Sequence, residues 1–223
     1  MRDGSFLVFD MDGVLAEVSE SYLAAVAATV HHFTGATVSR EKIEEYKQAG
    51  GWNNDWALAH KLVTDIGRSE VTYPEIVSTF QSLFLGTHGD GLITREKWLP
   101  ADGLLPRLSQ KHRLAIFTGR PRAEIDITLK RFVPEVKWDA IVADEDVAKP
   151  KPAPDGLFAI AALEPEGLLT YVGDNVDDAR SARAAGAAFV GIAESHQPRL
   201  AQLLRDEGAR SVIASVNEIE GVL

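Results

Sequence analysis

Phe6-Leu-Val-Phe-Asp-Met-Asp-Gly-Val-Leu15 is the stretch that decides how this chain folds. Its first four residues are apolar, which predicts a fully buried strand because the run is too short for a helix. The run ends at two carboxylates, Asp10 and Asp12, followed by Gly13, whose tolerance of positive φ permits a sharp turn. Open parallel sheets bind ligands beyond the carboxyl ends of their strands. The stretch therefore predicts a site at Asp10 and Asp12, although Asp and Gly are also ordinary turn residues.

The composition is that of an ordinary globular protein. The chain has 223 residues, of which 45% are hydrophobic and 25% charged. It contains no cysteine, which excludes disulfides, thiolate metal sites and a cysteine nucleophile. We find neither a signal-peptide pattern nor an apolar run of about 18 residues, so we expect a cytoplasmic protein without a membrane span. The net charge of −10 argues against binding to nucleic acid or to an anionic membrane.

A helical pattern follows the first strand. Amphipathic periodicity and helix-terminal residues predict four helices, at about residues 19–33, 40–48, 54–66 and 72–85. No strand pattern interrupts them. We therefore expect a separate α-helical domain over residues 16–98, inserted into a domain formed by residues 1–15 and 99–223.

One turn within this helical segment has an unusual composition. Trp52, Asn53, Asn54 and Asp55 follow two glycines between the second and third predicted helices. A structural interpretation is that an Asn or Asp caps the next helix while both tryptophans, Trp52 and Trp56, pack in the helical core. A functional interpretation is that these side chains select a substrate, since loops on a rigid scaffold commonly carry recognition. The sequence leaves both open.

Strand patterns return after Pro100. We expect strands at about residues 113–117, 138–143, 170–172 and 187–192, with helices between them. This alternation predicts an α/β fold with a doubly wound parallel sheet. Thr118 and Gly119 follow the first of these strands, and a hydroxyl and a glycine amide ahead of a helix suit an anion. Thr-Gly is also a common turn.

Two later stretches carry charged side chains near predicted strand ends. Lys149 and Lys151 lie in a loop that three prolines stiffen, and Asp174 and Asp178 follow the strand at 170–172. The two aspartates are spaced i, i+4, so they share one face if a helix begins there. For the lysine loop, the structural alternative is a solvated linker.

Taken together, these stretches resemble the haloacid dehalogenase superfamily. Its four motifs occur in order, as Asp10-Met-Asp-Gly-Val-Leu15, Thr118-Gly119, Lys151-Pro-Ala-Pro-Asp155 and Gly173-Asp-Asn-Val-Asp-Asp178. The helical insert resembles the α-helical cap of the phosphoglycolate-phosphatase-like branch, known as subfamily IA. The resemblance implies a Rossmann-like core carrying a cap domain.

The resemblance also implies an activity. It points to a Mg²⁺-dependent phosphatase that hydrolyses a small phosphorylated metabolite through an aspartyl-phosphate, as a monomer or a homodimer. Asp10 would be the nucleophile, and Asp12 would protonate the leaving alcohol and then activate water. The metal ligands would be Asp10, the backbone carbonyl of Asp12 and Asp174, with Asp178 in support.

Thr118, the amide of Gly119 and Lys151 would bind the transferring phosphoryl oxygens. The pattern Lys-Pro-x-Pro-Asp favours Lys151 over Lys149 for this role. The spacing Gly-Asp-x-x-x-Asp likewise favours Asp178 over the adjacent aspartate at position 177 for the last acidic position.

Two other functions are consistent with parts of the sequence. A phosphomutase on the same scaffold would return the phosphoryl group to a sugar instead of to water. A non-catalytic phospho-acceptor or ligand-binding module would also combine an aspartate with acidic metal ligands, Thr and Lys. The large helical insert and the second aspartate, Asp12, disfavour the phospho-acceptor.

Overall fold

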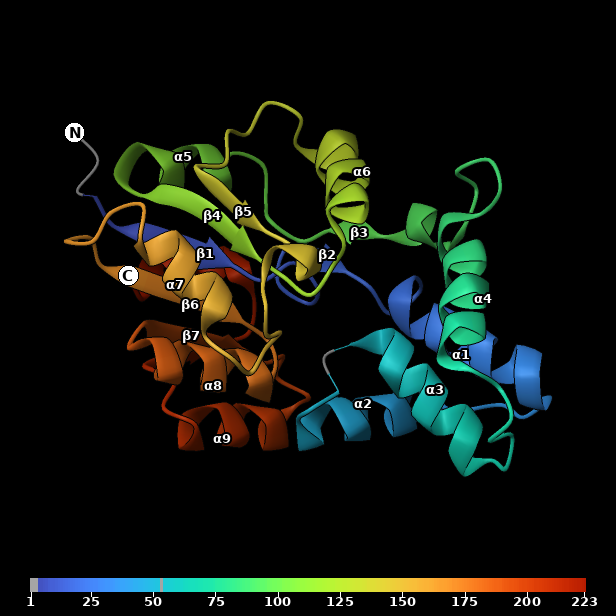
Figure 1. The fold of residues 1–223 in the computed structure, drawn as a ribbon. Helices are drawn as coiled ribbons and strands as arrows, with labels where there is room; N and C mark the ends of the chain where they lie inside the picture. The colour runs from blue at the N-terminus through green and yellow to red at the C-terminus, as the bar shows by residue number, and fades with distance from the viewer. Residues whose placement is uncertain (1–3, 53) are drawn as a thin grey trace. The chain divides into compact units, whose positions relative to one another are not determined.

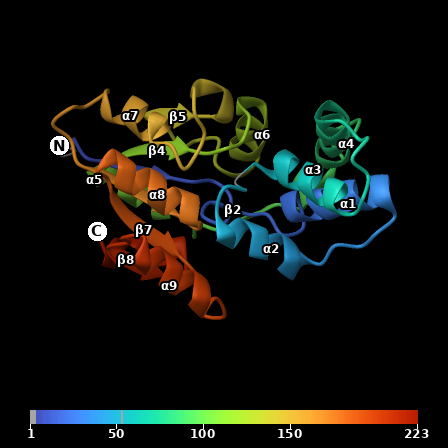
Figure 2. The same cartoon turned by 60° about the horizontal axis from the view of Figure 1, so that its bottom comes forward.

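The computed structural model describes residues 4–52 and 54–223. Contacts within the chain divide it into two compact units. One comprises Met1–Ala16 and Trp98–Leu223, and the other comprises Glu17–Lys97. These limits lie within one residue of the domain limits expected from the sequence. Figure 1 labels most of the helices and strands of both units, and Figure 2 also labels β8.

The first unit is built on a six-stranded parallel sheet in the order β5-β4-β1-β6-β7-β8 (Figure 1). Its strands are β1 (Phe6–Phe9), β4 (Arg113–Phe117), β5 (Ala140–Val142), β6 (Leu169–Gly173), β7 (Ala188–Ile192) and β8 (Ser211–Ile213). The register places Phe9 opposite Ile116 of β4 and Val172 of β6. The prediction of an α/β fold with a doubly wound parallel sheet is confirmed.

Helices cover both faces of this sheet. They are α5 (Leu104–Lys111), α6 (Arg122–Phe132), α7 (Asp155–Ala161), α8 (Val176–Ala185) and α9 (Pro198–Asp206). Along β1, Leu7 and Phe9 pack in one hydrophobic cluster with side chains of α5 and α6. Phe6 and Val8 pack in the opposite cluster with side chains of α7, α8 and α9. Because successive strand residues point to opposite faces, burial on both faces explains why all four residues are apolar.

The direction in which successive strands are added to the sheet reverses at β1. The crossover from β1 leads to β4 on one side, whereas β6 lies on the other side. Such a switch point opens a crevice at the carboxyl ends of the strands, where doubly wound proteins bind ligands. The residues that follow β1, β4 and β6 at this edge are Asp10, Thr118 and Asp174.

One strand was not predicted. The sequence pattern indicated five strands in this sheet, and the structure adds β8 at the edge beside β7. Its three residues, Ser211-Val-Ile213, are too few for an alternating pattern to be recognised. The strand expected at residues 138–143 is shorter and covers Ala140–Val142.

The second unit is helical. It contains α1 (Tyr22–Thr34), α2 (Arg40–Ala49), α3 (Asp55–Asp65), α4 (Tyr73–Leu85) and the short 3₁₀ helix η1 (Leu92–Arg95). Helix α1 contacts the other three α-helices, as Figure 2 shows, and their buried apolar side chains form one cluster. Two short strands, β2 (Ala16–Glu17) and β3 (Lys97–Trp98), pair where the chain enters and leaves this unit. None of the helices described is long and apolar enough to cross a membrane.

Candidate active site

Asp10 lies immediately beyond β1 and is almost fully buried, at 3% exposure. Its backbone N–H still donates to the carbonyl oxygen of Val172 in β6, at 2.8 Å, which holds the residue at the sheet edge. Its Oδ1 accepts a hydrogen bond from the N–H of Met11 at 2.7 Å and lies 2.9 Å from Lys151 Nζ. Among the described residues, no donor contacts Oδ2, so one oxygen is held and the other is available.

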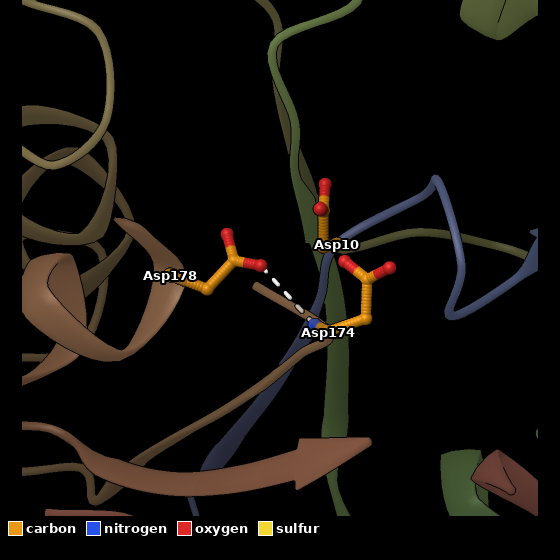
Figure 3. Close-up of side chains that lie close together, drawn as sticks. All are labelled: Asp10, Asp174 and Asp178. Atoms are coloured by element: carbon orange, nitrogen blue, oxygen red, sulfur yellow. Dashed lines mark hydrogen bonds between the residues drawn. The ribbon is translucent and has the colours of Figure 1, made fainter. Parts of the chain in front are cut away.

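Three carboxylates converge at this point (Figure 3). Asp10, Asp174 and Asp178 each contribute an oxygen, and these atoms lie within 4.8 Å of one another. The donors are all oxygens, the ligands that hard divalent cations such as Mg²⁺ take in proteins. In Figure 3 the carboxyl groups of Asp10 and Asp174 lie beside each other, whereas Asp178 reaches the backbone nitrogen of Asp174. The residues present therefore fit a divalent cation.

Gly13 makes room for this cluster. A Cβ atom on Gly13 would lie only 1.9 Å from Oδ2 of Asp174, and the backbone φ of Gly13 is +70°. Any other residue would collide with the carboxylate and adopt a backbone conformation that L-residues rarely take. The glycine of the first motif thus has a specific partner 161 positions later in the chain.

Asp178 is fully buried and hydrogen-bonded on both oxygens. Its Oδ1 lies 2.7 Å from Lys151 Nζ and 2.9 Å from the Tyr171 hydroxyl. Its Oδ2 accepts from the backbone N–H groups of Asp174 and Asn175, each at 3.2 Å. These contacts fix the turn that carries Asp174, so the geometry gives Asp178 a supporting position in the cluster.

Lys151 lies between the carboxylates. Its side chain is 1% exposed, and Nζ contacts both Asp10 and Asp178 and lies over the rings of Phe117 and Tyr171. Burial alone would lower the pKa of Lys151, but the two carboxylates raise it above its usual value. The lysine is therefore charged at neutral pH. Lys149, in contrast, is exposed.

The same burial changes the acid groups. It raises the pKa of Asp10 to about 7, with Lys151 opposing the rise and the carboxylates of Asp178 and Asp12 adding to it. Burial, followed by the charge of Asp178, raises the pKa of the Tyr171 hydroxyl well above its usual value. Tyr171 is thus a neutral hydrogen-bond partner of Asp178, and the charge at Asp10 depends on cations beside it.

Thr118 and Gly119 occupy the end of the neighbouring strand, β4. Thr118 is buried, and its backbone N–H donates to the carbonyl oxygen of Val142 at 3.1 Å. Its hydroxyl oxygen accepts from the N–H of Arg120 at 3.3 Å, which forms a tight turn ahead of α6. The structure therefore brings Thr118, Asp10 and Asp174 to adjacent strand ends of one sheet.

Arg120 is a charged residue of this site that the sequence did not single out. It is 1% exposed, and its Nε and Nη2 lie 2.6 and 2.5 Å from Oδ1 of Asp12. Glu124, one turn further on, is also buried, and burial, with the charges of Asp12 and Glu145, raises its pKa to about 8. The sequence feature that could have indicated Arg120 is its position, because it directly follows the Thr-Gly pair at a strand end.

The turn in the helical unit has contacts of its own. Asn54 caps α3, because its Oδ1 accepts from the N–H of Ala57 at 2.9 Å. The ring of Trp52 packs edge-to-face against Tyr46, with centroids 5.8 Å apart. These contacts are those that the structural interpretation predicts.

Asp55 is buried beside this cap. Its Oδ1 lies 2.8 Å from Lys47 Nζ at the end of α2, so the pair joins two helices of the same unit. Asn53 lies outside the described residues. A role for this turn in substrate selection remains a prediction.

Comparisons with known proteins agree with this arrangement. The family model described as haloacid dehalogenase-like hydrolase matches residues 7–192. A phosphoglycolate phosphatase of Cereibacter sphaeroides is 26% identical over 200 residues, covering 86% of each chain. An imidazoleglycerol-phosphate dehydratase of Phytophthora nicotianae is 39% identical over 194 residues, which are 83% of this chain but only 42% of that protein.

A solved structure shares the whole fold. The subfamily IA hydrolase of Geobacter sulfurreducens superposes with a TM-score of 0.64 at 21% identity, covering 98% of this chain and 99% of the other. Since the family model spans most of the sequence, this chain belongs to the haloacid dehalogenase-like hydrolase family.

Proposed function

We propose that this protein is a Mg²⁺-dependent phosphatase that hydrolyses a small phosphorylated metabolite through an aspartyl-phosphate on Asp10. The observation that carries the proposal is the cluster of buried Asp10, Asp178 and Lys151 with half-buried Asp174 at the carboxyl ends of β1 and β6. One oxygen of Asp10 is held while the other has no donor among the described residues. A carboxylate held in this way is suited to nucleophilic attack.

In the first step, Asp10 Oδ2 attacks the phosphorus atom and the bond from phosphorus to the ester oxygen breaks. Asp12 gives its proton to the departing oxygen, so an alcohol leaves. A bond from phosphorus to Asp10 thus replaces the bond to the ester oxygen, and Asp10 now carries the phosphoryl group. The positive charge of Lys151, 2.9 Å from Asp10, reduces the repulsion that an anionic phosphoryl group meets.

In the second step, Asp12 accepts a proton from water as its oxygen attacks the same phosphorus atom. The bond from phosphorus to Asp10 breaks, inorganic phosphate leaves, and both aspartates return to their starting states. Thr118 and the amide of Gly119 would donate to the phosphoryl oxygens throughout. When bound to Asp10, the carbonyl of Asp12 and Asp174, Mg²⁺ supplies further positive charge at the phosphoryl group.

The relatives narrow the substrates to be tested. The proteins named phosphoglycolate phosphatase and pyrophosphatase PpaX both act on small phosphorylated compounds, and the latter, from Bacillus pumilus, is 27% identical over 192 residues. The third relative is named after imidazoleglycerol phosphate, itself a phosphate monoester. We therefore infer a small, soluble phosphate ester or anhydride as the substrate.

The test is a panel assay with Mg²⁺ that contains 2-phosphoglycolate, pyrophosphate, imidazoleglycerol phosphate and several sugar phosphates. We expect release of inorganic phosphate by the wild type and none above background by Asp10→Asn, shown by circular dichroism to be folded. Near wild-type turnover by folded Asp10→Asn would contradict a covalent intermediate. An isomerised sugar phosphate without free phosphate would instead identify a phosphomutase. Stable phosphorylation without turnover would identify a phospho-acceptor.

A further inference from the structure

The contact between Arg120 and Asp12 is the strongest feature that the proposed reaction leaves unexplained. Two nitrogens of the guanidinium, Nε at 2.6 Å and Nη2 at 2.5 Å, contact the same oxygen, Oδ1 of Asp12. The third nitrogen, Nη1, donates to the hydroxyl of Thr128 on α6 at 3.0 Å. The arginine is thereby fixed at both ends, since its backbone N–H donates to Thr118.

The two partners differ in exposure. The side chain of Arg120 is 1% exposed, whereas that of Asp12 is 24% exposed. Burying a guanidinium requires a partner of opposite charge with good geometry. Arg120 is therefore buried against a carboxylate that itself remains accessible. If Arg120 only stabilised the core, its guanidinium would not need to contact Asp12, the one carboxylate assigned to proton transfer.

We infer that Arg120 is a positioning residue for Asp12, which it holds in the orientation needed for proton transfer to the leaving group and from water. This inference rests on the proposed function. Aspartate has two rotatable side-chain bonds, and Asp12 lies beyond the end of β1, where its backbone forms an isolated bridge to Ala16. Two contacts to one oxygen restrict both rotations and leave the second oxygen as the one that exchanges the proton. Correct placement of a reacting group is worth orders of magnitude in rate.

The chain offers a matched control two residues away. Arg122 is also an arginine at the start of α6, but its side chain is 35% exposed. It donates to the carbonyl oxygen of Ile141 at 2.6 Å and contacts the carboxylate of Asp146, not Asp12. Arg122→Lys therefore changes the same chemical group two residues away without altering the contact under test.

The experiment compares Arg120→Lys, Arg122→Lys and Asp12→Asn with two aryl esters in the presence of Mg²⁺. p-Nitrophenyl phosphate has a leaving group that departs without a proton, whereas phenyl phosphate needs one. With p-nitrophenyl phosphate, we expect Arg120→Lys to release a burst of about one p-nitrophenol per site, followed by slow turnover. The first bond breaks normally, but Asp12 is poorly placed to activate water. With phenyl phosphate we expect no burst.

With phenyl phosphate, we expect the steady-state kcat of Arg120→Lys to fall at least about 10-fold, within the 10²- to 10⁴-fold that general acid–base catalysis supplies, while KM changes little. With p-nitrophenyl phosphate, kcat and KM should fall together, because slow hydrolysis of the aspartyl-phosphate lowers both. Arg122→Lys should match the wild type. The double variant Asp12→Asn, Arg120→Lys should be no slower than Asp12→Asn alone, because the arginine acts through Asp12. Three results would each overturn the inference. They are a double variant in which the two losses of kcat multiply, an Arg120→Lys variant with a raised KM but unchanged kcat, and an Arg120→Lys variant with wild-type kinetics.

Thr128→Val provides a second test should Arg120→Lys fail to fold. It removes only the hydroxyl that anchors Nη1, and we expect the same burst with a smaller fall in kcat. Wild-type kinetics in Thr128→Val would then overturn the inference. The proposed function fails separately, if the wild type hydrolyses neither ester or if Asp12→Asn is fully active.

Discussion

Lys151 Nζ lies 2.7 Å from Oδ1 of Asp178, and both side chains are buried. The lysine also contacts Asp10 at 2.9 Å, so one cation is shared by two carboxylates. Charges removed from water are stable only when they are paired and hydrogen-bonded. This ion pair therefore links the loop after β5 to the ends of β1 and β6, and its integrity sets both the stability and the charge of the site.

Replacing Lys151 by Met should destabilise the protein by about 3–5 kcal/mol, because the two buried carboxylates lose their cation. Phosphatase activity should also be lost. Lys149→Met is the control, since Lys149 also precedes a proline but is exposed. Its free energy of unfolding should stay within about 0.5 kcal/mol of the wild type. Urea unfolding measures both variants, and equal stability would contradict the ion-pair argument.

Gly13→Ala should weaken metal binding. Its new Cβ would collide with Asp174, whereas an Ala at Gly186, which has the same φ of +70°, would meet no atom within 4 Å. Both variants should lose about 1–2 kcal/mol of stability for the left-handed backbone. Only Gly13→Ala should also lower the affinity for Mg²⁺ measured by calorimetry. Equal affinities in the two variants would mean that Asp174 does not bind the ion.

Removing divalent cations with EDTA should abolish activity, and added Mg²⁺ should restore it. Ca²⁺ is larger and coordinates less strictly, so we expect it to restore activity poorly. Asp174→Asn should need a higher Mg²⁺ concentration for half-maximal activity, because an amide oxygen is a weaker ligand than a carboxylate. Full turnover in metal-free buffer would refute the metal assignment.

Glu124 should make the stability depend on pH. Burial, with the charges of Asp12 and Glu145, raises its pKa from 4.5 to about 8, so the folded protein keeps a proton that the unfolded chain releases. The contribution of Glu124 to stability therefore falls as pH rises from about 4.5 to 8 and is constant above. One pKa unit corresponds to about 1.4 kcal/mol.

Glu124→Gln removes the titrating carboxyl group. The variant should therefore gain stability relative to the wild type as pH rises from about 4.5 to 8. Thermal or urea unfolding at pH 5, about pH 6.5 and about pH 8 measures the difference. Glu135→Gln, at an exposed position, is the control. A difference between Glu124→Gln and wild type that is constant with pH would show that Glu124 is ionised in the folded protein.

Asn54→Ala should lower the free energy of unfolding by about 0.5–2 kcal/mol, the usual cost of losing a helix cap. We expect the ratio of kcat/KM for the best metabolite to that for p-nitrophenyl phosphate to stay unchanged, because the side chain is engaged with Ala57. Unchanged stability with an altered ratio would instead assign this turn to substrate selection.

Local patterns in the sequence determined the main elements of this protein. The apolar run at Phe6–Phe9 predicted β1, since only a strand of a two-sided core buries four consecutive apolar residues in so short a segment. The alternation of strands and helices after Pro100 predicted the parallel sheet. The positions of the carboxylates also predicted one site, because residues that follow separate parallel strands meet at one edge of the sheet.

Contacts between distant segments were decided only in the tertiary structure. Lys149 and Lys151 precede prolines alike, and Asp177 adjoins Asp178, so only the spacing of the family motifs favoured Lys151 and Asp178. Packing separates them: Lys151 is buried against Asp178, whereas Lys149 is exposed and Asp177 lies 3.7 Å from Arg180. The direction of a side chain in a loop depends on what packs around it, and those neighbours lie far away in the chain.

Arg120 illustrates the same limit. An arginine after a strand is ordinarily solvated, and nothing in its neighbours along the chain marks it as buried. Its partner Asp12 is 108 positions away and reaches it only because β1 and β4 are adjacent in the sheet. The sequence determined which residues could carry charge at the strand ends, and the strand order determined which of those charges are paired.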